Sequence, residues 1–521
     1  MQRRPTYEQL ATLVVQQAAV IESLAARVGE QDERIARQDA RIAELERQVG
    51  RSSSNSSQPP SQDGPAAKAR TKAEARDRVR DGEQAQRRQG GQKGHPGTGL
   101  VRVAVPDRRE SVEPPACAGC GAGLAGAPGQ VAASVQVFDL PVFAVTVTEY
   151  LMMRRTCSGC GDTTTAAAPP QVTGAPACYG PNVVAAATFL ASQDVIGIER
   201  AADMMSALLG ADVSTGFVSR CLARLDGALL AAGFEDALKN ALRQAEVLGT
   251  DETPAPITAS GAAAETAQTG EDISNPHVFT VRTLRSCTTG GPDLVWFGAA
   301  GTRTKKAITA FGILDDYAGV LVRDDFGGYL SYDPDLAGVQ QCLSHMLRHL
   351  QDAHDIDPDT QAWTVQAADA LRTAIHAANL ARRTGADLDP RVIAEARHRF
   401  DQAVACGISI NLSRPWPKGN HPGLVLAKRL QRKADQVWLF TTRRDVPPTN
   451  NGSEAAIRGF KLAEKVSGCW RTLATLRRHC RIRSYLESAR NHGRRPLDAI
   501  RGALTGTTWA PPRITAGALA A

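Results

Sequence analysis

The sequence lacks any apolar run long enough to cross a lipid bilayer. Its longest apolar stretches, such as residues 183–190, are far shorter than the ~20 residues that a membrane-spanning helix needs. The first residues, Met-Gln-Arg-Arg-Pro, lead into a charged segment and lack the apolar core of a secretion signal. These absences argue against a membrane or secreted protein, and we expect a cytoplasmic protein that does not contact a membrane.

The chain also lacks an even set of cysteines and a strong net charge. Eleven cysteines, mostly unpaired in sequence, favour a reducing compartment over a disulfide framework. The net charge is only +7, yet residues 51–100 hold ten Lys or Arg against five Asp or Glu, and residues 456–501 hold twelve against three. Two basic segments on an otherwise acidic chain predict phosphate-binding surfaces, as for nucleic acid; solvated faces of Arg-rich helices are the alternative.

What the chain does have is length, 521 residues with 42% apolar, which is enough for several separate cores. Residues 1–50 carry the heptad pattern of a coiled coil, with β-branched residues at six successive a positions and Leu or Gln at the d positions. This pattern favours a parallel two-stranded coil, so we expect a homodimer formed through residues 8–49. A single amphipathic helix packed on the rest of the protein is the alternative. The a positions are Val14, Ile21, Val28, Ile35, Ile42 and Val49.

Residues 51–105 have the composition of a flexible basic linker. Their first part, residues 51–64, is rich in Ser, Gln and Pro and has little apolar surface to bury. A basic tract runs from Lys68 to Arg88, and Lys93 lies in the Gly-rich stretch after it. The tract is either an arm that settles along a phosphate backbone, with Lys93 as a DNA contact, or a solvated tether.

Two Cys-X-X-Cys-Gly motifs follow the linker. Each has the spacing of a zinc knuckle, and the Gly after the second Cys permits the left-handed turn that points backbone N–H groups at a thiolate. We expect a structural Zn²⁺ held by all four cysteines in a zinc ribbon, over residues 106–168, with hairpin strands at 135–140 and 145–154; a redox dithiol is the weaker alternative. The four cysteines are Cys117, Cys120, Cys157 and Cys160.

Residues 169–244 have a helical pattern. Residues 198–209, a break at Gly210, and residues 215–225 with Ser214 as their cap resemble a helix-turn-helix. Such a motif would hold DNA. A helical part that braces a neighbouring domain fits the same residues equally well.

Three acidic residues stand in contexts that suit metal binding. Asp251 and Asp324 each end a short apolar run of the kind that forms a buried strand, and Glu454 lies near the start of a helix-like stretch. Carboxylates delivered in this way gather oxygen ligands for two Mg²⁺ ions, which stabilise the attacking and leaving oxygens of a phosphoryl transfer. Taken singly, each acid is more readily a turn or cap residue. Asn450 and Asn451 are expected to cap the helix of Glu454.

The elements between these acids occur in a recognisable order. Strands at residues 277–284 and 293–298 follow the Asp251 strand, and a helix at residues 303–314 precedes the Asp324 strand. Strand, strand, strand, helix, strand is the order of a ribonuclease H-like domain, in which the third acid arrives on a later helix.

We expect this domain to span residues 245–500. The separation of Asp324 and Glu454 exceeds what its core needs, so a largely helical insertion is expected at about residues 355–440. Residues 501–521 are expected to be a tail. The predicted fold class is therefore multidomain α/β: a coiled coil, a Cys₄ zinc ribbon, a helical subdomain and a ribonuclease H-like domain with a helical insertion.

Across residues 50–500 the chain resembles the transposases of the bacterial insertion-sequence-sixty-six family, which belong to the DDE class. The resemblance rests on an ordered set of motifs rather than on any one of them. They are Ser53-Ser-Asn-Ser-Ser-Gln-Pro-Pro, the two knuckles, Tyr179-Gly-Pro, Asp251-Glu-Thr-Pro, Asp324-Asp-Phe-Gly-Gly-Tyr, Cys342-Leu-Ser-His345 with Arg348, and Asn450-Asn-Gly-Ser-Glu454 with Arg458.

The resemblance implies a transposase that cleaves DNA strands at the ends of an element and joins them to target DNA. It implies two Mg²⁺ (or Mn²⁺) ions held by Asp251, Asp324 and Glu454, small accessory proteins encoded by the element, and a place near the bacterial nucleoid. It also selects Asp251 over Glu252 and Asp324 over Asp325, a choice that the residues alone leave open because central strands are buried on both faces.

Basic residues near Glu454 are the candidates for DNA contacts. Arg458 shares a helix face with Glu454 and either binds a phosphate or pairs with the acid. His345 and Arg348 share a face in the same way, and His345 either assists near the metal ions or is a structural residue. Arg481 and Arg483 are further candidates for backbone contacts. The main set is Lys93, His345, Arg348, Arg458, Arg471, Arg477 and Arg478.

Two other functions are compatible with the residues. A non-catalytic zinc-ribbon protein would bind DNA and give no metal-dependent product. A ribonuclease H-like nuclease would cut DNA without joining it.

Overall fold

The computed structural model describes five stretches of the chain and four isolated residues near its start. The stretches are residues 102–139, 144–169, 177–284, 292–416 and 418–512, and the isolated residues are Arg27, Gln31, Arg34 and Gln38, all helical. The chain divides into two units, Pro65–Val145 and a larger one formed by Met1–Gly64 with Thr146–Ala521. Apart from those four positions, the expected coiled coil lies outside the described residues, as do residues 51–101 with Lys93.

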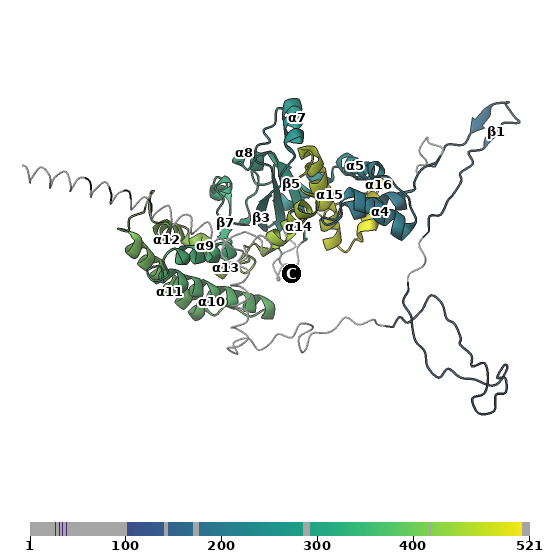
Figure 1. The fold of residues 1–521 in the computed structure, drawn as a ribbon, viewed down its shortest axis with the longest axis horizontal. Helices are drawn as coiled ribbons and strands as arrows, with labels where there is room; N and C mark the ends of the chain where they lie inside the picture. The colour runs from purple at the N-terminus through teal and green to yellow at the C-terminus, as the bar shows by residue number, and fades with distance from the viewer. Residues whose placement is uncertain are drawn as a thin grey trace, which may run out of the picture. The chain divides into compact units, whose positions relative to one another are not determined.

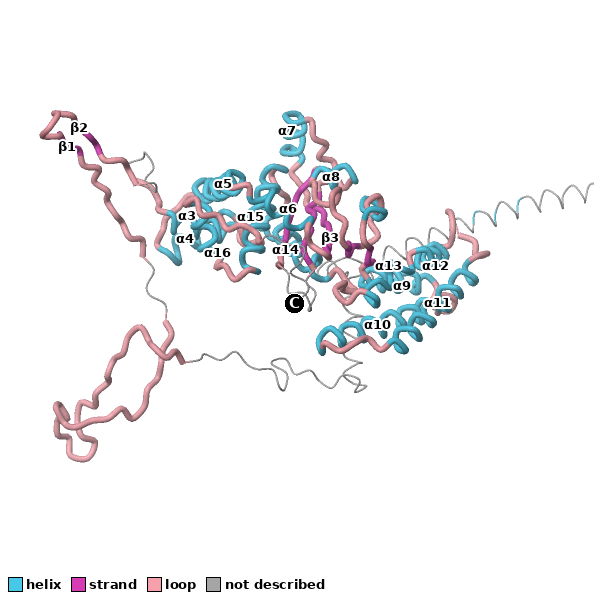
Figure 2. Tube along the Cα trace, turned by 180° about the vertical axis from the view of Figure 1, so that it is seen from behind, coloured by secondary structure: helices cyan, strands magenta, loops and turns pink. Residues whose placement is uncertain are grey.

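The larger unit is built around a five-stranded mixed sheet, which confirms the expected mixed α/β class. The strand order is β5-β4-β3-β6-β7, with β3, β4 and β5 antiparallel and β3, β6 and β7 parallel. Figure 2 shows these strands among the helices. The strands are β3 (Val247–Pro254), β4 (His277–Thr283), β5 (Val295–Ala300), β6 (Val320–Arg323) and β7 (Gly338–Gln341).

Two details of the sheet differ from the sequence-based expectation. Asp251 was expected to end its strand, but β3 continues to Pro254 because its second half stays paired with β4, as far as the pair Pro254 and His277. Strand β7 was not expected at all. Its sequence, Gly-Val-Gln-Gln, has neither an apolar run nor an apolar alternation, so the usual strand signal is missing.

Helices cover both faces of the sheet. On one face Leu238 of α6 (Phe234–Arg243) belongs to the same buried cluster as Phe279 and Trp296 of the sheet. On the other face Phe460 of α14 (Asn451–Ser467) packs with the neighbouring sheet residue Phe297. Neighbouring strand residues therefore point to opposite faces of the sheet, each covered by its own hydrophobic core. Each large apolar side chain buried in these cores stabilises the folded protein by about 1.5–3 kcal/mol.

Side chains of two helices occupy the edges of the sheet. On α15 (Leu473–Asn491), the hydroxyls of Ser484 and Ser488 accept from the N–H groups of Phe297 and Val295 in β5, at 2.8 and 3.0 Å. At the other edge, Gln340 of β7 bonds to α13 (Ala434–Thr442), accepting from the N–H of Phe440 at 2.8 Å. The serine bonds occupy backbone N–H groups of β5 that would otherwise offer a template for another strand, whereas the Gln340 bond joins its side chain to the backbone of α13.

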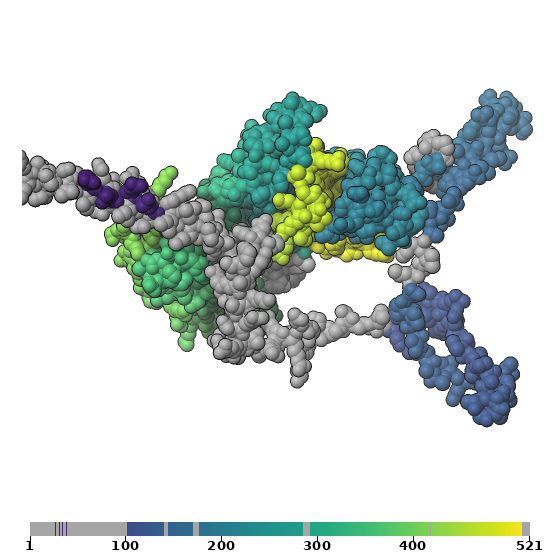
Figure 3. Space-filling view, in the orientation of Figure 1, coloured from purple at the N-terminus to yellow at the C-terminus, as the bar shows by residue number. Residues whose placement is uncertain are grey.

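Helices precede the sheet and follow it. The helices expected at residues 198–209 and 215–225 are present as α4 and α5, separated by Gly210 with φ +61° and with the Ser214 hydroxyl accepting from the Phe217 N–H at 3.1 Å. In the space-filling view the yellow C-terminal residues lie against this blue helical part (Figure 3). The elements here are α3 (Pro181–Ala191), α4 (Ile198–Leu209), α5 (Thr215–Ala231) and α16 (Pro496–Leu504).

Between β7 and α14 the chain is helical. Its helices share a buried cluster of their own, centred on Trp363, Phe400 and Trp438. The helices are α9 (Leu343–Ile356), α10 (Trp363–Thr384), α11 (Pro390–Asn411), α12 (Pro422–Arg432) and α13, labelled in Figure 1. The remaining elements of this unit are α7 (Ala259–Thr269), α8 (Lys305–Ala310) and the 3₁₀ turns η2 (Gly327–Tyr329) and η3 (Asp333–Asp335). No helix in the described stretches is long and apolar enough to cross a membrane.

The two cysteine knuckles have the same local geometry. In each, the Gly after the second Cys has positive φ, +74° at Gly121 and +78° at Gly161, and its N–H donates to the carbonyl of the first Cys at 2.9 Å. Strands β1 (Arg154–Thr156) and β2 (Thr163–Thr165) flank the second knuckle. Because Val145 ends one unit and Thr146 begins the other, the knuckles lie in different units and the four-cysteine zinc site stays a prediction.

The hairpin strands expected between the knuckles are wrong for the residues described there. Residues 135–139 and 145–153 contain no strand. Val135, Val137 and Val147 are each more than 80% exposed, so their alternation has no buried face to stabilise a strand.

Candidate active site

Asp251 lies in the central strand β3 and interacts electrostatically with three other acids. Burial raises its pKa first, and the charges of Glu252, Glu454 and Asp324 raise it further, to about 8. Strands β3 and β6 run parallel with Gly249 beside Val322, and this register continued by two residues sets Asp251 beside Asp324. Asp251 therefore lies in β3 and Asp324 directly after the end of the adjacent strand β6, near the centre of the sheet.

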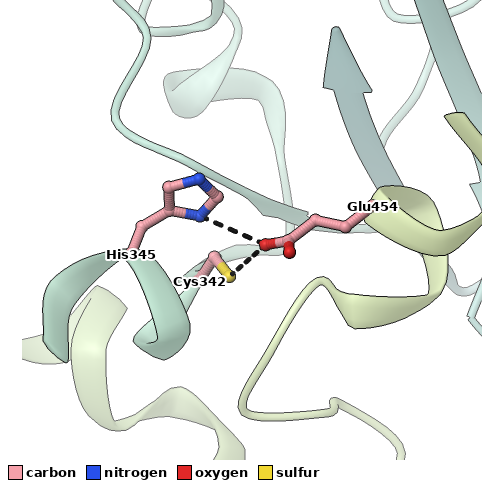
Figure 4. Close-up of side chains that lie close together, drawn as sticks. All are labelled: Cys342, His345 and Glu454. Atoms are coloured by element: carbon pink, nitrogen blue, oxygen red, sulfur yellow. Dashed lines mark hydrogen bonds and ion pairs between the residues drawn. The ribbon is translucent and has the colours of Figure 1, made fainter. Parts of the chain in front are cut away.

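Glu454 lies in the first turn of α14 and is held by the start of α9. Its Oε1 atom accepts from the Cys342 thiol at 3.7 Å and lies 3.4 Å from Nδ1 of His345 and 3.8 Å from the Arg348 guanidinium. Figure 4 shows Cys342 and His345 pointing at the same carboxylate oxygen. The His345 contact is poorly aligned for a hydrogen bond, since Nδ1 has no hydrogen-bond partner among the described residues.

The start of α14 is fastened to β3 at a glycine. Asn450 donates from Nδ2 to the carbonyl of Thr250 at 2.6 Å. A Cβ added at Gly249 would lie 2.6 Å from both Asn450 Oδ1 and Ser453 Oγ, which is closer than any side chain allows. The expected capping role of Asn450 is wrong: it occupies the N-cap position, but its side chain makes no cap bond and turns to the sheet instead. Only a residue without a side chain at position 249 lets Glu454 approach the Asp251 strand this closely.

Asp324 follows β6 on a rigid backbone. Its Oδ1 accepts from the N–H of Phe326 at 3.0 Å. The preceding residue, Arg323, is fully buried, donates to both oxygens of Asp333 at 2.7 Å, and donates to the Asp324 carbonyl at 2.8 Å. A buried, bidentate arginine of this kind fixes the chain on both sides of the acid.

The acid that follows each of these aspartates is neutralised by basic residues. Glu252, whose side chain is 3% exposed, accepts from Arg303 Nε at 3.0 Å and from the Tyr329 hydroxyl at 2.7 Å. Asp325 pairs with Lys433 and lies 3.2 Å from Arg429. Within the described stretches, no Lys or Arg forms an ion pair with Asp251 or Asp324. The first acid of each pair is therefore the better candidate for a metal ligand.

Two observations bear on metal binding. Burial and the charges of Glu252, Glu454 and Asp324 raise the pKa of Asp251, and carboxylates are the kind of oxygen ligand that binds Mg²⁺. In the described stretches, the grouping whose possible ligand atoms all lie within 4.8 Å of one another is Cys342, His345 and Glu454, which includes neither Asp251 nor Asp324. Burial raises the pKa of the Cys342 thiol to about 11, however, and a metal is bound by the thiolate. We therefore interpret Cys342 as a neutral donor that holds Glu454.

The arginines expected to contact DNA divide into two groups. Arg458 on α14 and Arg471 before α15 are exposed. Arg477 instead donates to Glu271 at 2.6 Å and to the Ala299 carbonyl at 3.2 Å, and Arg478 lies 3.9 Å from Asp226. His345 and Arg348 lie beside Glu454, as described above.

Two further arginines of α15 point into the protein. Arg481 pairs with Asp226 and donates to Glu235 at 2.8 Å, and Arg483 pairs with Asp194. All three acids come from the helical part that precedes the sheet. The charge of α15 that was expected to face phosphate thus joins this helix to α5, α6 and the end of α3.

The sequence reasoning missed several residues of the site. Gly249, Arg303 and Lys433 were not singled out, and Tyr329 was noted only as part of a family motif. Gly249 carried a usable signal, because a glycine inside an apolar run often marks a close approach of another chain segment. The basic partners carried none, since they lie 51 and 108 residues from the acids they neutralise.

Comparison with known families gives two matches. Residues 176–478 match the family described as Transposase IS66 family, and residues 3–100 match a family of unknown function (DUF6444). The first match covers more than half of the 521 residues, so the chain belongs to the IS66 family of transposases. No curated protein matches the chain. Membership confirms the resemblance found in the sequence and indicates a function in DNA transposition, with DNA as the partner.

Proposed function

We propose that this protein is a DDE transposase that cleaves the strand ends of its element and joins them to target DNA. The observation that carries the proposal is the approach of acids from β3, the end of β6 and the start of α14: burial, and then the charges of Glu252, Glu454 and Asp324, raise the pKa of Asp251 to about 8. Neither Asp251 nor Asp324 forms an ion pair with a Lys or Arg of the described stretches, and clustered groups with perturbed pKa values are typical of catalytic sites.

The sheet supports this proposal. Three antiparallel strands followed by two parallel ones, with the acids on adjacent central strands and a third acid on a later helix, is the arrangement expected of a ribonuclease H-like domain. The helices α10 to α13 then form the insertion between β7 and the Glu454 helix.

In this proposal Asp251, Asp324 and Glu454 hold two Mg²⁺ (or Mn²⁺) ions, which would stabilise the attacking and leaving oxygens at the scissile phosphate. The chain's own part is to fix the three carboxylates. Gly249 and Asn450 hold α14 against β3, while Cys342, His345 and Arg348 meet one oxygen of Glu454. Arg348 and the exposed Arg458 would contact DNA phosphate beside the acids.

The other predicted parts complete the proposal. Residues 8–49 would pair two subunits, and Cys117, Cys120, Cys157 and Cys160 would hold a structural Zn²⁺. The helical part at residues 177–244 would contribute to binding the element ends, and accessory proteins encoded by the element would assist. We place the protein in the bacterial cytoplasm, at the nucleoid.

A cleavage and joining assay on DNA carrying paired element ends tests the proposal. Asp251→Asn should abolish both products while binding of the ends persists, because the change removes a metal ligand and leaves the DNA-binding surfaces intact. Asp316→Asn is the matched control, since that side chain is 78% exposed. Cleavage by Asp251→Asn at the wild-type rate would refute the site, and cleavage without joining by the wild-type protein would favour a nuclease.

A further inference from the structure

We propose that Glu252 is a positioning residue that holds Asp324 in place through Arg303, Tyr329 and Phe326. The inference rests on the proposed function, because it assigns a task to the acid beside the catalytic Asp251. It gives separate roles to the two adjacent acids of β3, Asp251 and Glu252, of which only Glu252 has a basic partner.

Both oxygens of Glu252 are already used. Oε1 accepts from Arg303, whose Nε lies at 3.0 Å, and Oε2 accepts from the Tyr329 hydroxyl at 2.7 Å. The side chain is 3% exposed. A metal ion would have to displace two charge-assisted or buried hydrogen bonds to bind here, so Glu252 is fitted to act on protein groups.

Tyr329 and Arg303 both bear on Phe326. The Tyr329 ring, which is buried, lies edge-on to the Phe326 ring with centroids 5.6 Å apart. The Arg303 guanidinium lies over the Phe326 ring, 3.8 Å from its centroid. Phe326 therefore contacts two side chains that both bond to Glu252.

Phe326 transmits this anchoring to the acid. Its N–H donates to Oδ1 of Asp324 at 3.0 Å, so the orientation of that carboxylate depends on where the backbone of Phe326 lies. The Tyr329 hydroxyl, which donates to Glu252, also lies 3.1 Å from the Thr250 hydroxyl of the same strand. The loop from Asp324 to Tyr329 is thus joined to β3 beside the site.

Binding of Mn²⁺ to the full-length protein, measured by titration with detection of free Mn²⁺, tests the inference without relying on activity. Tyr329→Phe and Arg303→Lys keep the net charge; the first removes the bond to Oε2 of Glu252, and the second replaces the two-nitrogen contact with Oε1 by a single ammonium group. Both should weaken the Mn²⁺ binding that Asp251→Asn abolishes, by about tenfold, as the loss of groups that orient metal ligands usually does. DNA-end binding should not change.

Matched controls separate positioning from a general loss of packing. Tyr332→Phe removes another buried hydroxyl bond, to Thr309 at 2.7 Å, and Arg243→Lys removes a bond to the Gly312 carbonyl at 2.7 Å. Both control variants should bind Mn²⁺ with the affinity of the wild type. A lower melting temperature in either would then show a loss of stability without a loss of Mn²⁺ binding. If one of the two test variants fails to fold, the other decides.

The outcomes distinguish the inference from the function beneath it. Wild-type affinity in both Tyr329→Phe and Arg303→Lys, with Asp251→Asn defective, would overturn the positioning role alone. A wild-type protein that has no Mn²⁺ site sensitive to Asp251→Asn would overturn the proposed function as well.

Discussion

Two regions of this protein hold charged side chains away from water, and they treat charge in opposite ways. Between α15 and the preceding helical part, each buried arginine meets an acid: Arg481 meets Asp226 and Glu235, and Arg483 meets Asp194. Around Asp251 the neighbouring charges are acidic, and burial together with these charges raises the pKa of the Asp251 carboxyl.

The difference separates structural charge from functional charge. Removing a charge from water is costly unless an opposite charge and hydrogen bonds replace the solvent, and the α15 layer obeys this rule. The acid cluster breaks it, whereas Glu252 and Asp325, one residue away, each pair with a basic residue, although burial and the charge of Asp324 still raise the pKa of Glu252. In the proposed function a bound cation would supply the positive charge that Asp251 and Asp324 lack.

The largest expected effect comes from removing one acid of the cluster. Asp324→Asn should abolish strand cleavage, because a metal ligand is lost. It should leave the melting temperature in EDTA unchanged or higher, because repulsion between like charges falls. Cleavage assays and thermal melts measure the two effects, and a strongly destabilised but active variant would reverse the interpretation of this region.

Removing an arginine from the ion pairs of α15 should instead lower the stability of the protein. Arg481→Met removes the partner that Asp226 and Glu235 share, while Lys239 stays 3.0 Å from Glu235 and Arg478 3.9 Å from Asp226, so it should lower the free energy of unfolding by about 1–3 kcal/mol. Chemical denaturation measures this loss. Arg372→Met is the control, since its pair with Asp369 is more than half exposed on both sides and should contribute under about 1 kcal/mol. Equal losses in the two variants would show that the α15 layer is no stronger than a surface pair.

The approach of α14 to β3 should depend on one missing side chain. Gly249→Ala places a methyl group against Asn450 and Ser453, so α14 and Glu454 must shift. We expect a loss of about 1–3 kcal/mol in stability and a fall in cleavage rate on the order of 100-fold. Gly227→Ala on α5, where added atoms meet open space, should change neither by much. A wild-type cleavage rate in Gly249→Ala would show that the approach is not needed for catalysis.

The last expected effect needs no substitution and is a pH dependence of stability in the metal-free protein. The pKa of Asp251 is raised from about 3.9 in an unfolded chain to about 8, so between these values the folded state binds the additional proton. The free energy of unfolding should therefore fall as pH rises from 5 to 8, by at most about 1.4 kcal/mol per pH unit. Denaturation in EDTA at several pH values checks this, and Asp251→Asn should remove that part of the slope.

Much of the fold can be predicted from the sequence because local patterns specify it. Apolar runs mark β3 and β6, and Ser214 after Gly210 marks the boundary between two helices. Strand β7 escapes prediction because its glutamines serve a tertiary contact, with Gln340 bonded to α13, about a hundred residues later. Asn450 is misread for the same reason, since a good capping residue serves the sheet instead.

In the candidate site, too, residues with a local sequence signal can be predicted and residues that depend on distant partners cannot. The acids are visible in the sequence as Asp at the ends of apolar runs and Glu at a helix start, and the family motifs choose between neighbours. The inward direction of Arg481 and Arg483 is not visible, because their partners Asp194, Asp226 and Glu235 lie more than 240 residues away. Charge alone gives a segment's sign and says nothing of which side it faces.

The most direct measurement is a crystal structure of the protein soaked with Mn²⁺, in which anomalous scattering locates the ions. The account predicts anomalous peaks within bonding distance of carboxylate oxygens from Asp251, Asp324 and Glu454, with Glu252 still bonded to Arg303 and Tyr329. Ions bound only by Cys342, His345 and Glu454, or no ion near Asp251, would contradict it.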